Sequence, residues 1–180
     1  LPGLGEEVGQ ALVRHPGVRL IMFTGSKAAG LSILEAASKA SEGRRFVKHV
    51  VMEMGGKNAI IVDDDADLDA AIKGILTSAF SYQGQKCSAA SRLIVHEAVY
   101  DELMARLPGA VESLLVCDPV HPKCDMGPLI DAEAHQRVTT AIAGGTHSAT
   151  LLCQNPAARV PQEGYFVGPA LFADVNPHGA

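Results

Sequence analysis

A carboxylate and a thiol, Glu53 and Cys87, each lie in a glycine-containing segment and together offer the chemistry of a base and a nucleophile. Glu53 opens the segment EMGGK (53–57), and Cys87 lies in the segment QGQKCS (83–88). A thiolate can attack a carbonyl carbon, and a carboxylate can activate the water that later releases the product. Because a predicted strand and helix separate the two residues, the fold must bring them to one cleft.

The residues around Cys87 favour a reactive thiol. Gln83, Gln85 and Ser88 are too polar for a protein core. The positive charge of the adjacent Lys86 favours a thiolate. The alternative is a buried and inert thiol, which is the commonest state of an intracellular cysteine.

Glu53 has mostly apolar neighbours in the sequence, namely Val50, Val51, Met52 and Met54. An apolar environment makes a carboxylate a stronger base, so these neighbours predict a useful general base. The alternative is a surface carboxylate at the end of a strand. Taken singly, Glu53 and Cys87 leave both interpretations open.

Predicted strands and helices alternate along the chain. Apolar stretches predict strands over 18–23, 46–54, 58–62, 92–96 and 149–154. Apolar residues at helical spacing predict helices over 5–14, 26–40, 68–79, 97–107 and 131–143. Residues 118–127 are expected to form a loop, and Cys87 falls on the connection between a helix and a strand. This order predicts an α/β fold with much parallel strand pairing.

A glycine turn follows the first predicted strand. Ser26, after Thr24 and Gly25, is expected to cap the helix that comes next. The start of a helix attracts an anion such as a pyrophosphate, because its N–H groups are unpaired and its dipole is positive there. Gly25 and Gly30 have the opening spacing of a P-loop, but Leu31 stands where the lysine should follow, which excludes ATP or GTP bound in that way. A plain capping turn is the alternative.

The four cysteines do not form a tight disulfide framework, and we expect reduced thiols at Cys87, Cys117, Cys124 and Cys153. A zinc site at Cys117, His121 and Cys124 would need a further ligand from a neighbouring aspartate. Small, apolar thiols in a proline-containing loop need no such role, so we do not expect a metal there.

A calcium loop is also considered for the acidic residues Asp63, Asp65 and Asp67, which occupy its first, third and fifth positions. Leu68 stands where this loop needs glycine, and Gly74 stands where it needs glutamate. The acidic residues are better explained as the start of a helix, where the dipole favours negative charge.

Composition narrows the range of partners. The chain has 180 residues, of which 47% are hydrophobic, and a domain of this size can bury roughly 70% of its unfolded surface. With a net charge of −5 and a pI of 5.8, the chain lacks the excess of basic residues that a nucleic-acid binder has. No stretch approaches the roughly 18 apolar residues that a membrane span needs. We expect no nucleic-acid or membrane partner, and a cytoplasmic protein, or one of the mitochondrial matrix if it is eukaryotic.

Motifs along nearly the whole chain resemble the NAD(P)-dependent aldehyde dehydrogenases. They are LPG (1–3), FTGS (23–26), EMGGK (53–57), the run from 84 to 92, DMGPL (125–129) and GYF (164–166). The run 83–92 is most similar to the 1-pyrroline-5-carboxylate dehydrogenase branch, also called L-glutamate γ-semialdehyde dehydrogenase. The resemblance implies part of a Rossmann-type NAD-binding domain over residues 1–54, followed by part of an α/β catalytic domain over 55–180.

The resemblance also implies a role for each candidate residue. Cys87 would be the nucleophile and Glu53 the base, while Lys86 and Ser88 would hold the carboxylate at the amino-acid end of the substrate. The cofactor, NAD with NADP as an alternative, would meet the turn residues Thr24, Gly25, Ser26 and Gly30.

Parts of the family pattern lie outside this chain, so we expect a central fragment of a homo-oligomeric enzyme that acts on a small aldehyde and is inactive by itself. Two other functions stay open. A cysteine hydrolase would need a histidine partner for the thiol, for which His49 and His96 are the nearest candidates. A non-catalytic nucleotide-binding or assembly module would keep the scaffold without needing Cys87.

Overall fold

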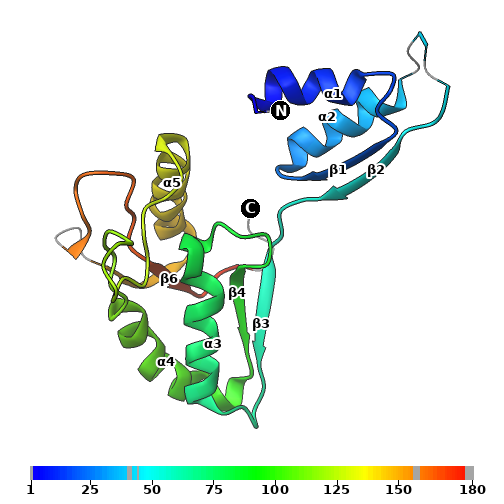
Figure 1. Ribbon diagram of the computed structural model, residues 1–180. Coiled ribbons are helices and arrows are strands. Elements are labelled where there is room, and N and C mark those ends of the chain that lie inside the picture. The colour runs from blue at the N-terminus through cyan, green and yellow to red at the C-terminus, as the bar shows by residue number, and fades with distance from the viewer. Residues whose placement is uncertain (1, 40–41, 44, 156–158, 177–180) are drawn as a thin grey trace. The chain divides into compact units, whose positions relative to one another are not determined.

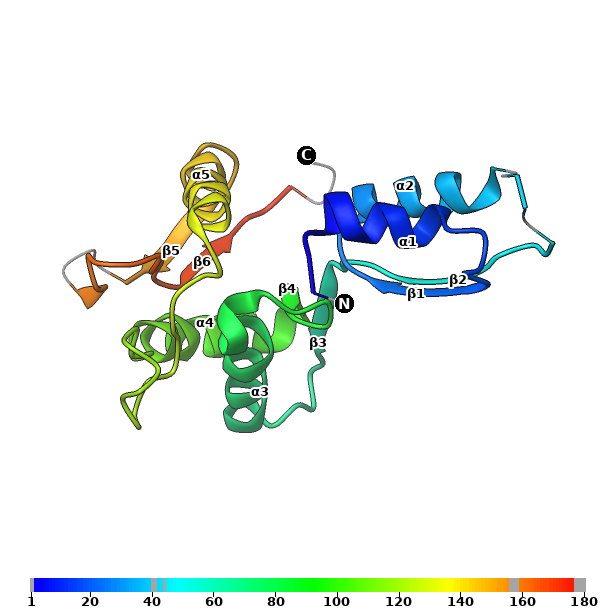
Figure 2. The same cartoon turned by 45° about the horizontal axis from the view of Figure 1, so that its top comes forward.

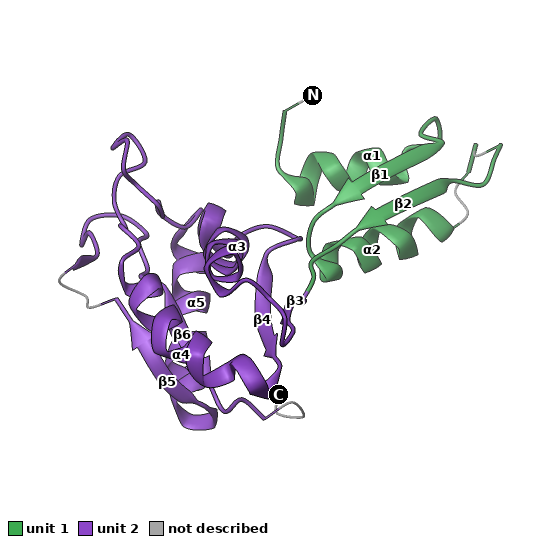
Figure 3. Cartoon of the chain, turned by 90° about the horizontal axis from the view of Figure 1, so that it is seen from below, with its two compact units in different colours: residues 1–56 green, residues 57–180 purple. Residues whose placement is uncertain are grey.

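The computed structural model describes residues 2–39, 42–43, 45–155 and 159–176. The chain divides into two compact units, Leu1–Gly56 and Lys57–Ala180, which Figure 3 shows in different colours. Whether these units correspond to a cofactor domain and a catalytic domain stays a prediction.

The first unit is built around a parallel pair of strands, β1 (Leu20–Thr24) and β2 (His49–Glu53). A π-helical turn, η1 (Gly5–Gly9), leads into α1 (Gln10–Arg14), and α2 (Lys27–Ser38) connects the two strands. Figure 2 shows α1 and α2 on the same side of the strand pair. The unit therefore contains a βαβ arrangement, as the sequence predicts.

Local signals explain where α2 and β2 begin. The Ser26 side chain accepts a hydrogen bond from the Ala29 N–H, which confirms the predicted cap of α2. The helix ends at Ser38, and the predicted end at Ala40 lies outside the described residues. Strand β2 is shorter than the predicted 46–54, because the buried Lys48 side chain binds carbonyl groups of the loop before β1 and regular pairing starts at His49.

The second unit begins with a βαβ motif, in which α3 (Leu68–Phe80) connects the parallel strands β3 (Asn58–Val62) and β4 (Ala90–Val95). The carboxylate of Asp67 caps α3 by accepting hydrogen bonds from the N–H groups of Asp69 and Ala70. A short 3-10 segment, η2 (Ser81–Gly84), follows α3 and leads toward Cys87. Figure 1 shows α3 beside β4, with the long helix α4 (Glu97–Glu112) near it.

Helix α4 is longer than the predicted 97–107 because it continues through Pro108 to Glu112. A proline inside a helix removes one backbone hydrogen bond and usually ends the helix. Here Leu103, Leu107 and Val111 are completely buried, and their packing offsets that loss. They belong to one core cluster, together with Val62, Leu68, Ile75 and Cys153.

The end of the unit consists of α5 (Ala132–Ser148), β5 (Thr150–Gln154) and β6 (Ala170–Ala173). Helix α5 runs past the predicted end at 143, and Gly145 leaves room for the ring of Phe172, since a Cβ there would lie 2.9 Å from it. Strands β5 and β6 pair antiparallel, whereas the other two described pairs are parallel, which confirms the predicted α/β fold with much parallel pairing. Among the described residues, no helix has the length and apolar character that crossing a membrane requires.

Candidate active site

The predicted base and the predicted cofactor turn lie side by side in the first unit. Thr24 and Glu53 are the last paired residues of the parallel strands β1 and β2, and the Gly25 N–H donates a 3.1 Å hydrogen bond to the Glu53 carbonyl. The carboxyl ends of parallel strands, followed by a helix N-terminus, are a common place for a nucleotide cofactor. The structure thus places one candidate catalytic residue beside the candidate pyrophosphate site.

The turn itself is exposed at Thr24, Gly25 and Ser26, and it leads into the first turn of α2, where backbone N–H groups have no partner within the helix. Gly30 is buried instead. A Cβ at this position would lie 3.0 Å from the Met54 sulfur, so the glycine lets α2 pack closely against the end of β2. Its predicted contact with a cofactor stays a prediction.

The apolar setting expected for Glu53 is wrong for this chain. Side chains of a strand point alternately to its two faces, and β2 alternates between exposed and half-buried residues. Val50 and Met52 are half-buried on one face, whereas Glu53 is exposed on the other. Val51 shares the face of Glu53 but is itself exposed, so the apolar neighbours in the sequence do not bury the carboxylate.

Cys87 is exposed at the corner of a tight turn in the second unit. The Ala89 N–H donates to the Lys86 carbonyl at 3.0 Å, which leaves Cys87 and Ser88 as the two central residues of the turn. The N–H groups of the two central residues are not used by such a turn. The predicted placement of Cys87 on a connection before a strand is confirmed.

Three consecutive residues before this turn have left-handed backbone conformations: Tyr82 with φ of 53°, Gln83 with 57° and Gly84 with 68°. Only glycine adopts this region without steric cost, and other residues kept there are frequent at functional sites. The ammonium group of Lys86 lies 5.7 Å from the centre of the Tyr82 ring, a cation–π distance. The exposed side chains of Lys86 and Ser88 flank the thiol, and their contact with a substrate stays a prediction.

The side chain of Asn58, which the sequence does not single out, holds this turn from β3, and Arg92 of β4 ties the start of the two strands together. The Asn58 amide nitrogen donates to the carbonyl oxygens of Cys87 at 2.7 Å and Ala89 at 3.3 Å. In the opposite direction, the Arg92 guanidinium donates to the Lys57 carbonyl. These partners are distant in sequence, and no local pattern could have found them.

The segment 125–130 also holds Gln83 and Gln85, which precede Cys87 in the chain. The Gln85 side-chain oxygen accepts a hydrogen bond from the Ile130 N–H at 3.2 Å. In the amide orientation that satisfies both of its groups, Gln83 accepts from the Gly127 N–H at 2.8 Å. The DMGPL motif (125–129) therefore has a structural explanation, since the N–H groups of Gly127 and of the adjacent Ile130 bind Gln83 and Gln85, which precede Cys87.

The other thiols contact one another or the backbone. The Cys124 thiol donates to the Cys117 carbonyl at 2.9 Å, and His121 accepts from the Lys123 N–H at 3.2 Å. Burial raises the pKa of the Cys117 thiol to about 11, and the neighbouring Cys124 and nearby carboxylates act in the same direction.

Of the two histidines proposed for a hydrolase, His96 is not placed as a partner of Cys87. His96 caps α4 by accepting the Ala98 N–H at 3.2 Å, and it follows the far end of β4. A strand of 6 residues separates it from the Cys87 turn by roughly 20 Å. His49 lies in the other unit, at the end of β2 opposite to Glu53.

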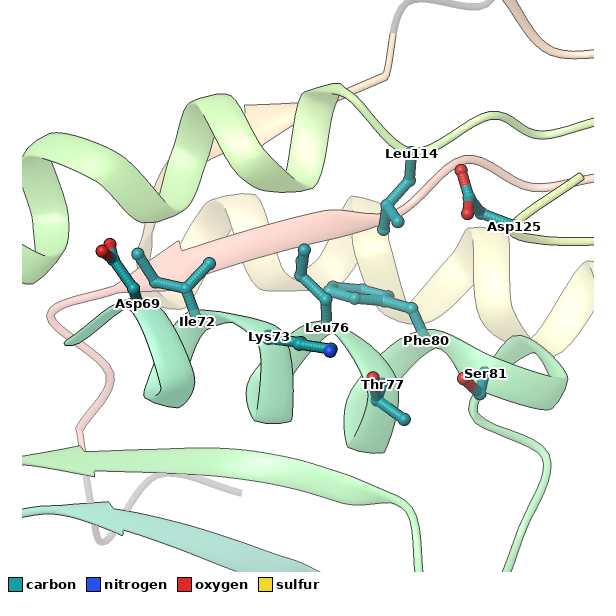
Figure 4. A pocket seen from close by; sticks show the side chains of 9 residues that line it. All are labelled: Asp69, Ile72, Lys73, Leu76, Thr77, Phe80, Ser81, Leu114 and Asp125. Atoms are coloured by element: carbon teal, nitrogen blue, oxygen red, sulfur yellow. The ribbon is translucent and has the colours of Figure 1, made fainter. Parts of the chain in front are cut away.

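A pocket of about 350 Å³ lies beside α3 (Figure 4). Its lining consists of Asp69, Ile72, Lys73, Leu76, Thr77, Phe80, Ser81, Leu114 and Asp125. The predicted site residues do not belong to this lining, so the pocket is separate from the chemistry proposed for Cys87.

Comparison with known proteins defines the class of this chain. The profile of the aldehyde dehydrogenase family matches residues 1–180, and the chain belongs to that family. A curated relative, 1-pyrroline-5-carboxylate dehydrogenase from Bacillus subtilis (strain 168), is 43% identical over 176 residues, which are 98% of this chain and 34% of the relative. The chain spans about a third of the length of such relatives.

Solved structures agree with this assignment and with the predicted aldehyde dehydrogenase-like fold. Proline utilization A from Bdellovibrio bacteriovorus, inactivated by N-propargylglycine, has a TM-score of 0.95 and 45% identity, over 99% of this chain and 18% of that chain. A 1-pyrroline-5-carboxylate dehydrogenase from Thermus with bound NAD has a TM-score of 0.91 and 44% identity, over 99% of this chain and 34% of that chain.

Proposed function

We propose that the protein containing this chain oxidises L-glutamate γ-semialdehyde to L-glutamate with NAD or NADP, a step of proline catabolism. The observation that carries the proposal is the exposed Cys87 thiol at the corner of a turn that the Asn58 side chain holds from β3. The similarity to 1-pyrroline-5-carboxylate dehydrogenases supports the choice of substrate.

In the proposed reaction, the Cys87 thiolate adds to the aldehyde carbon and forms a thiohemiacetal. N–H groups of the Cys87 turn stabilise the negative charge that develops on the aldehyde oxygen. NAD, when bound, supplies the acceptor for the hydride that leaves this carbon. Glu53 takes a proton from water, the resulting hydroxide attacks the Cys87 thioester, and the thiolate departs as the carboxylic acid forms.

The turn after β1 suits a dinucleotide. Thr24, Gly25 and Ser26 are exposed, and the positive end of the α2 dipole favours an anion there, although the Ala29 N–H is already bonded to the Ser26 side chain. Since Gly25 is hydrogen-bonded to the Glu53 carbonyl, a bound pyrophosphate would lie near the strand end that carries the base. We propose that these residues hold the cofactor.

The substrate carries a carboxylate at its amino-acid end. Lys86 and Ser88 flank Cys87 and are exposed, so an ammonium and a hydroxyl group are available on either side of the thiol. We assign to them the binding of this carboxylate. The proposal also includes a cytoplasmic protein that assembles from identical subunits, which size-exclusion chromatography of the full-length protein would test.

The test is NADH formation by the full-length protein at saturating NAD, with L-glutamate γ-semialdehyde as substrate. Cys87→Ala is expected to abolish turnover, while Cys117→Ala, which removes a thiol outside the turn, leaves it within about twofold because substitutions away from a site have small effects. Replacement of His49 or His96 leaves aldehyde oxidation in place. Inertness of the wild-type protein toward this and simple aldehydes would support a non-catalytic module instead.

A further inference from the structure

We propose that Asn58 is a positioning residue for the nucleophile: Asn58 holds the Cys87 turn directly, Arg92 ties the start of β4 to Lys57, and this clamp directs the N–H groups of the turn at the reacting oxygen. This inference rests on the proposed function, because it concerns the addition of Cys87 to a carbonyl. It adds a residue to the site that neither the motifs nor the similarity to relatives assigns.

The geometry of Asn58 suits a clamp. It is the first residue of β3, and its amide nitrogen reaches the carbonyl oxygens of Cys87 at 2.7 Å and Ala89 at 3.3 Å. A side-chain amide nitrogen has two hydrogens, so it can donate to both oxygens at once. Asn58 thereby restrains both the Cys87–Ser88 and the Ala89–Ala90 peptide groups.

Arg92 completes the clamp from the opposite strand. The pairing of β3 with β4 is irregular here, since Asn58 is opposite Ala90 but Ala59 is opposite Arg92, which leaves Ser91 as an extra residue. Such a bulge interrupts the backbone ladder next to the turn. The hydrogen bonds from Arg92 to the Lys57 carbonyl, and from Asn58 to the turn, hold the strand ends together across this interruption.

The clamp also sets the direction of an N–H donor. In a trans peptide the carbonyl and the N–H point to opposite sides, so fixing the Cys87 carbonyl toward Asn58 directs the Ser88 N–H away from it. The Ala89 N–H is already used by the turn, whereas those of Cys87 and Ser88 are not. Preorganised donors of this kind stabilise an oxyanion because they need no rearrangement during the reaction.

The experiment compares two reactions of Cys87 in the full-length protein. Acylation by p-nitrophenyl acetate passes through an oxyanion, whereas alkylation by iodoacetamide does not. In Asn58→Asp, which keeps the shape but replaces the donor by an acceptor, acylation is expected to slow by about 100-fold, the usual effect of a displaced oxyanion donor. Alkylation is expected to stay within about threefold of wild type, since that reaction needs no such donor.

Matched variants separate positioning from folding. Gln136→Glu makes the same amide-to-carboxylate change on α5, where Gln136 bonds Thr140, and is expected to leave both reactions unchanged. Arg92→Lys keeps a donor and is expected to retain more acylation than Arg92→Met. If Asn58→Asp does not fold, Asn58→Ser replaces it, and its shorter donor is expected to slow acylation and not alkylation.

The outcomes distinguish this inference from the proposed function. Equal loss of acylation and alkylation, or no loss of either, overturns the positioning role of Asn58. If Asn58→Asp selectively loses acylation and the wild-type full-length protein oxidises no aldehyde, the clamp is supported and the proposed dehydrogenase activity is refuted. Selective loss accompanied by a similar fall in kcat for semialdehyde oxidation, with KM nearly unchanged, supports both.

Discussion

At the scale of single residues, the chemistry depends on backbone conformations that few side chains tolerate. Tyr82, Gln83 and Gly84 all have positive φ directly before the exposed thiol turn. Hydrogen bonds from outside the turn help to maintain this unusual path, including the one between the Gln85 side chain and the Ile130 N–H. The non-glycine residues Tyr82 and Gln83 therefore carry backbone strain close to the Cys87 turn, as is common where geometry matters for function.

Gly84→Ala is the substitution that tests this strain. Its φ is 68°, and an added Cβ would lie 3.1 Å from the Ala79 carbonyl oxygen, so we expect a loss of more than about 1 kcal/mol in stability and a lower rate of aldehyde oxidation. The control is Gly74→Ala within α3, where an added Cβ meets no atom within 4 Å and stability should rise by about 0.5–1 kcal/mol. Thermal unfolding and NADH formation by the full-length protein measure both effects, and equal behaviour of the two variants would contradict the prediction.

At the scale of elements, the segment between α4 and α5 is held by backbone and thiol contacts without a regular strand or helix. Val116 and Met126 form an isolated bridge, and the Cys117 N–H donates to the Met126 carbonyl at 3.0 Å. The Cys124 thiol binds the Cys117 and Met126 carbonyls from within the same segment. These contacts fix the segment that contains Gly127 and Ile130, whose N–H groups bind Gln83 and Gln85 before the Cys87 turn.

The pKa of Cys117, raised from 9.0 to about 11, makes this segment sensitive to alkaline pH. The fold favours the neutral thiol, so its contribution to stability is present below about pH 9 and is lost as the pH rises through about 11. We expect Cys117 in the native protein to be alkylated more slowly at pH 9 than in the unfolded protein, and Cys124→Ala to narrow this difference.

Mass spectrometry of the alkylated peptides, over a pH series in the native and the urea-unfolded protein, measures the two rates. Cys117 reacting equally fast in both states at pH 9 would show that the neighbouring thiol and carboxylates do not hold its proton.

At the scale of the whole molecule, the chain corresponds to about a third of its curated relatives, and its two candidate catalytic residues belong to different compact units. Glu53 is exposed in this chain, whereas a general base in an aldehyde dehydrogenase reaction has to act away from bulk water.

We therefore expect the isolated chain of 180 residues to show no measurable oxidation of L-glutamate γ-semialdehyde under conditions in which the full-length protein turns over. The physical reason is that catalysis of this kind needs the thiol, the base and the cofactor in one geometry with water excluded. The comparison uses equal molar amounts of both proteins, with the full-length Cys87→Ala variant as the background. Turnover by the isolated chain above that background would refute the expectation.

Several elements could be predicted from sequence because their signals are local. The strand 58–62 and the start of the helix at Leu68 have the predicted bounds, and Ser26 caps α2 as expected. Helix α4 was predicted too short, since the buried contacts that carry it past Pro108 come from other parts of the fold. The burial of Glu53 was predicted wrongly because proximity in sequence is not proximity on one face of a strand.

The sequence by itself determined the family, the α/β order of elements, and the candidate thiol and carboxylate, because motif order, side-chain periodicity and caps are properties of neighbouring residues. Only the tertiary structure decided that Glu53 is exposed in this chain and that the Gly25 N–H joins its strand end to the predicted cofactor turn. It also decided that Asn58 bonds the Cys87 turn and that Arg92 bonds the Lys57 carbonyl. Burial and hydrogen bonds between distant residues exist only once the chain has folded, so no local pattern encodes them.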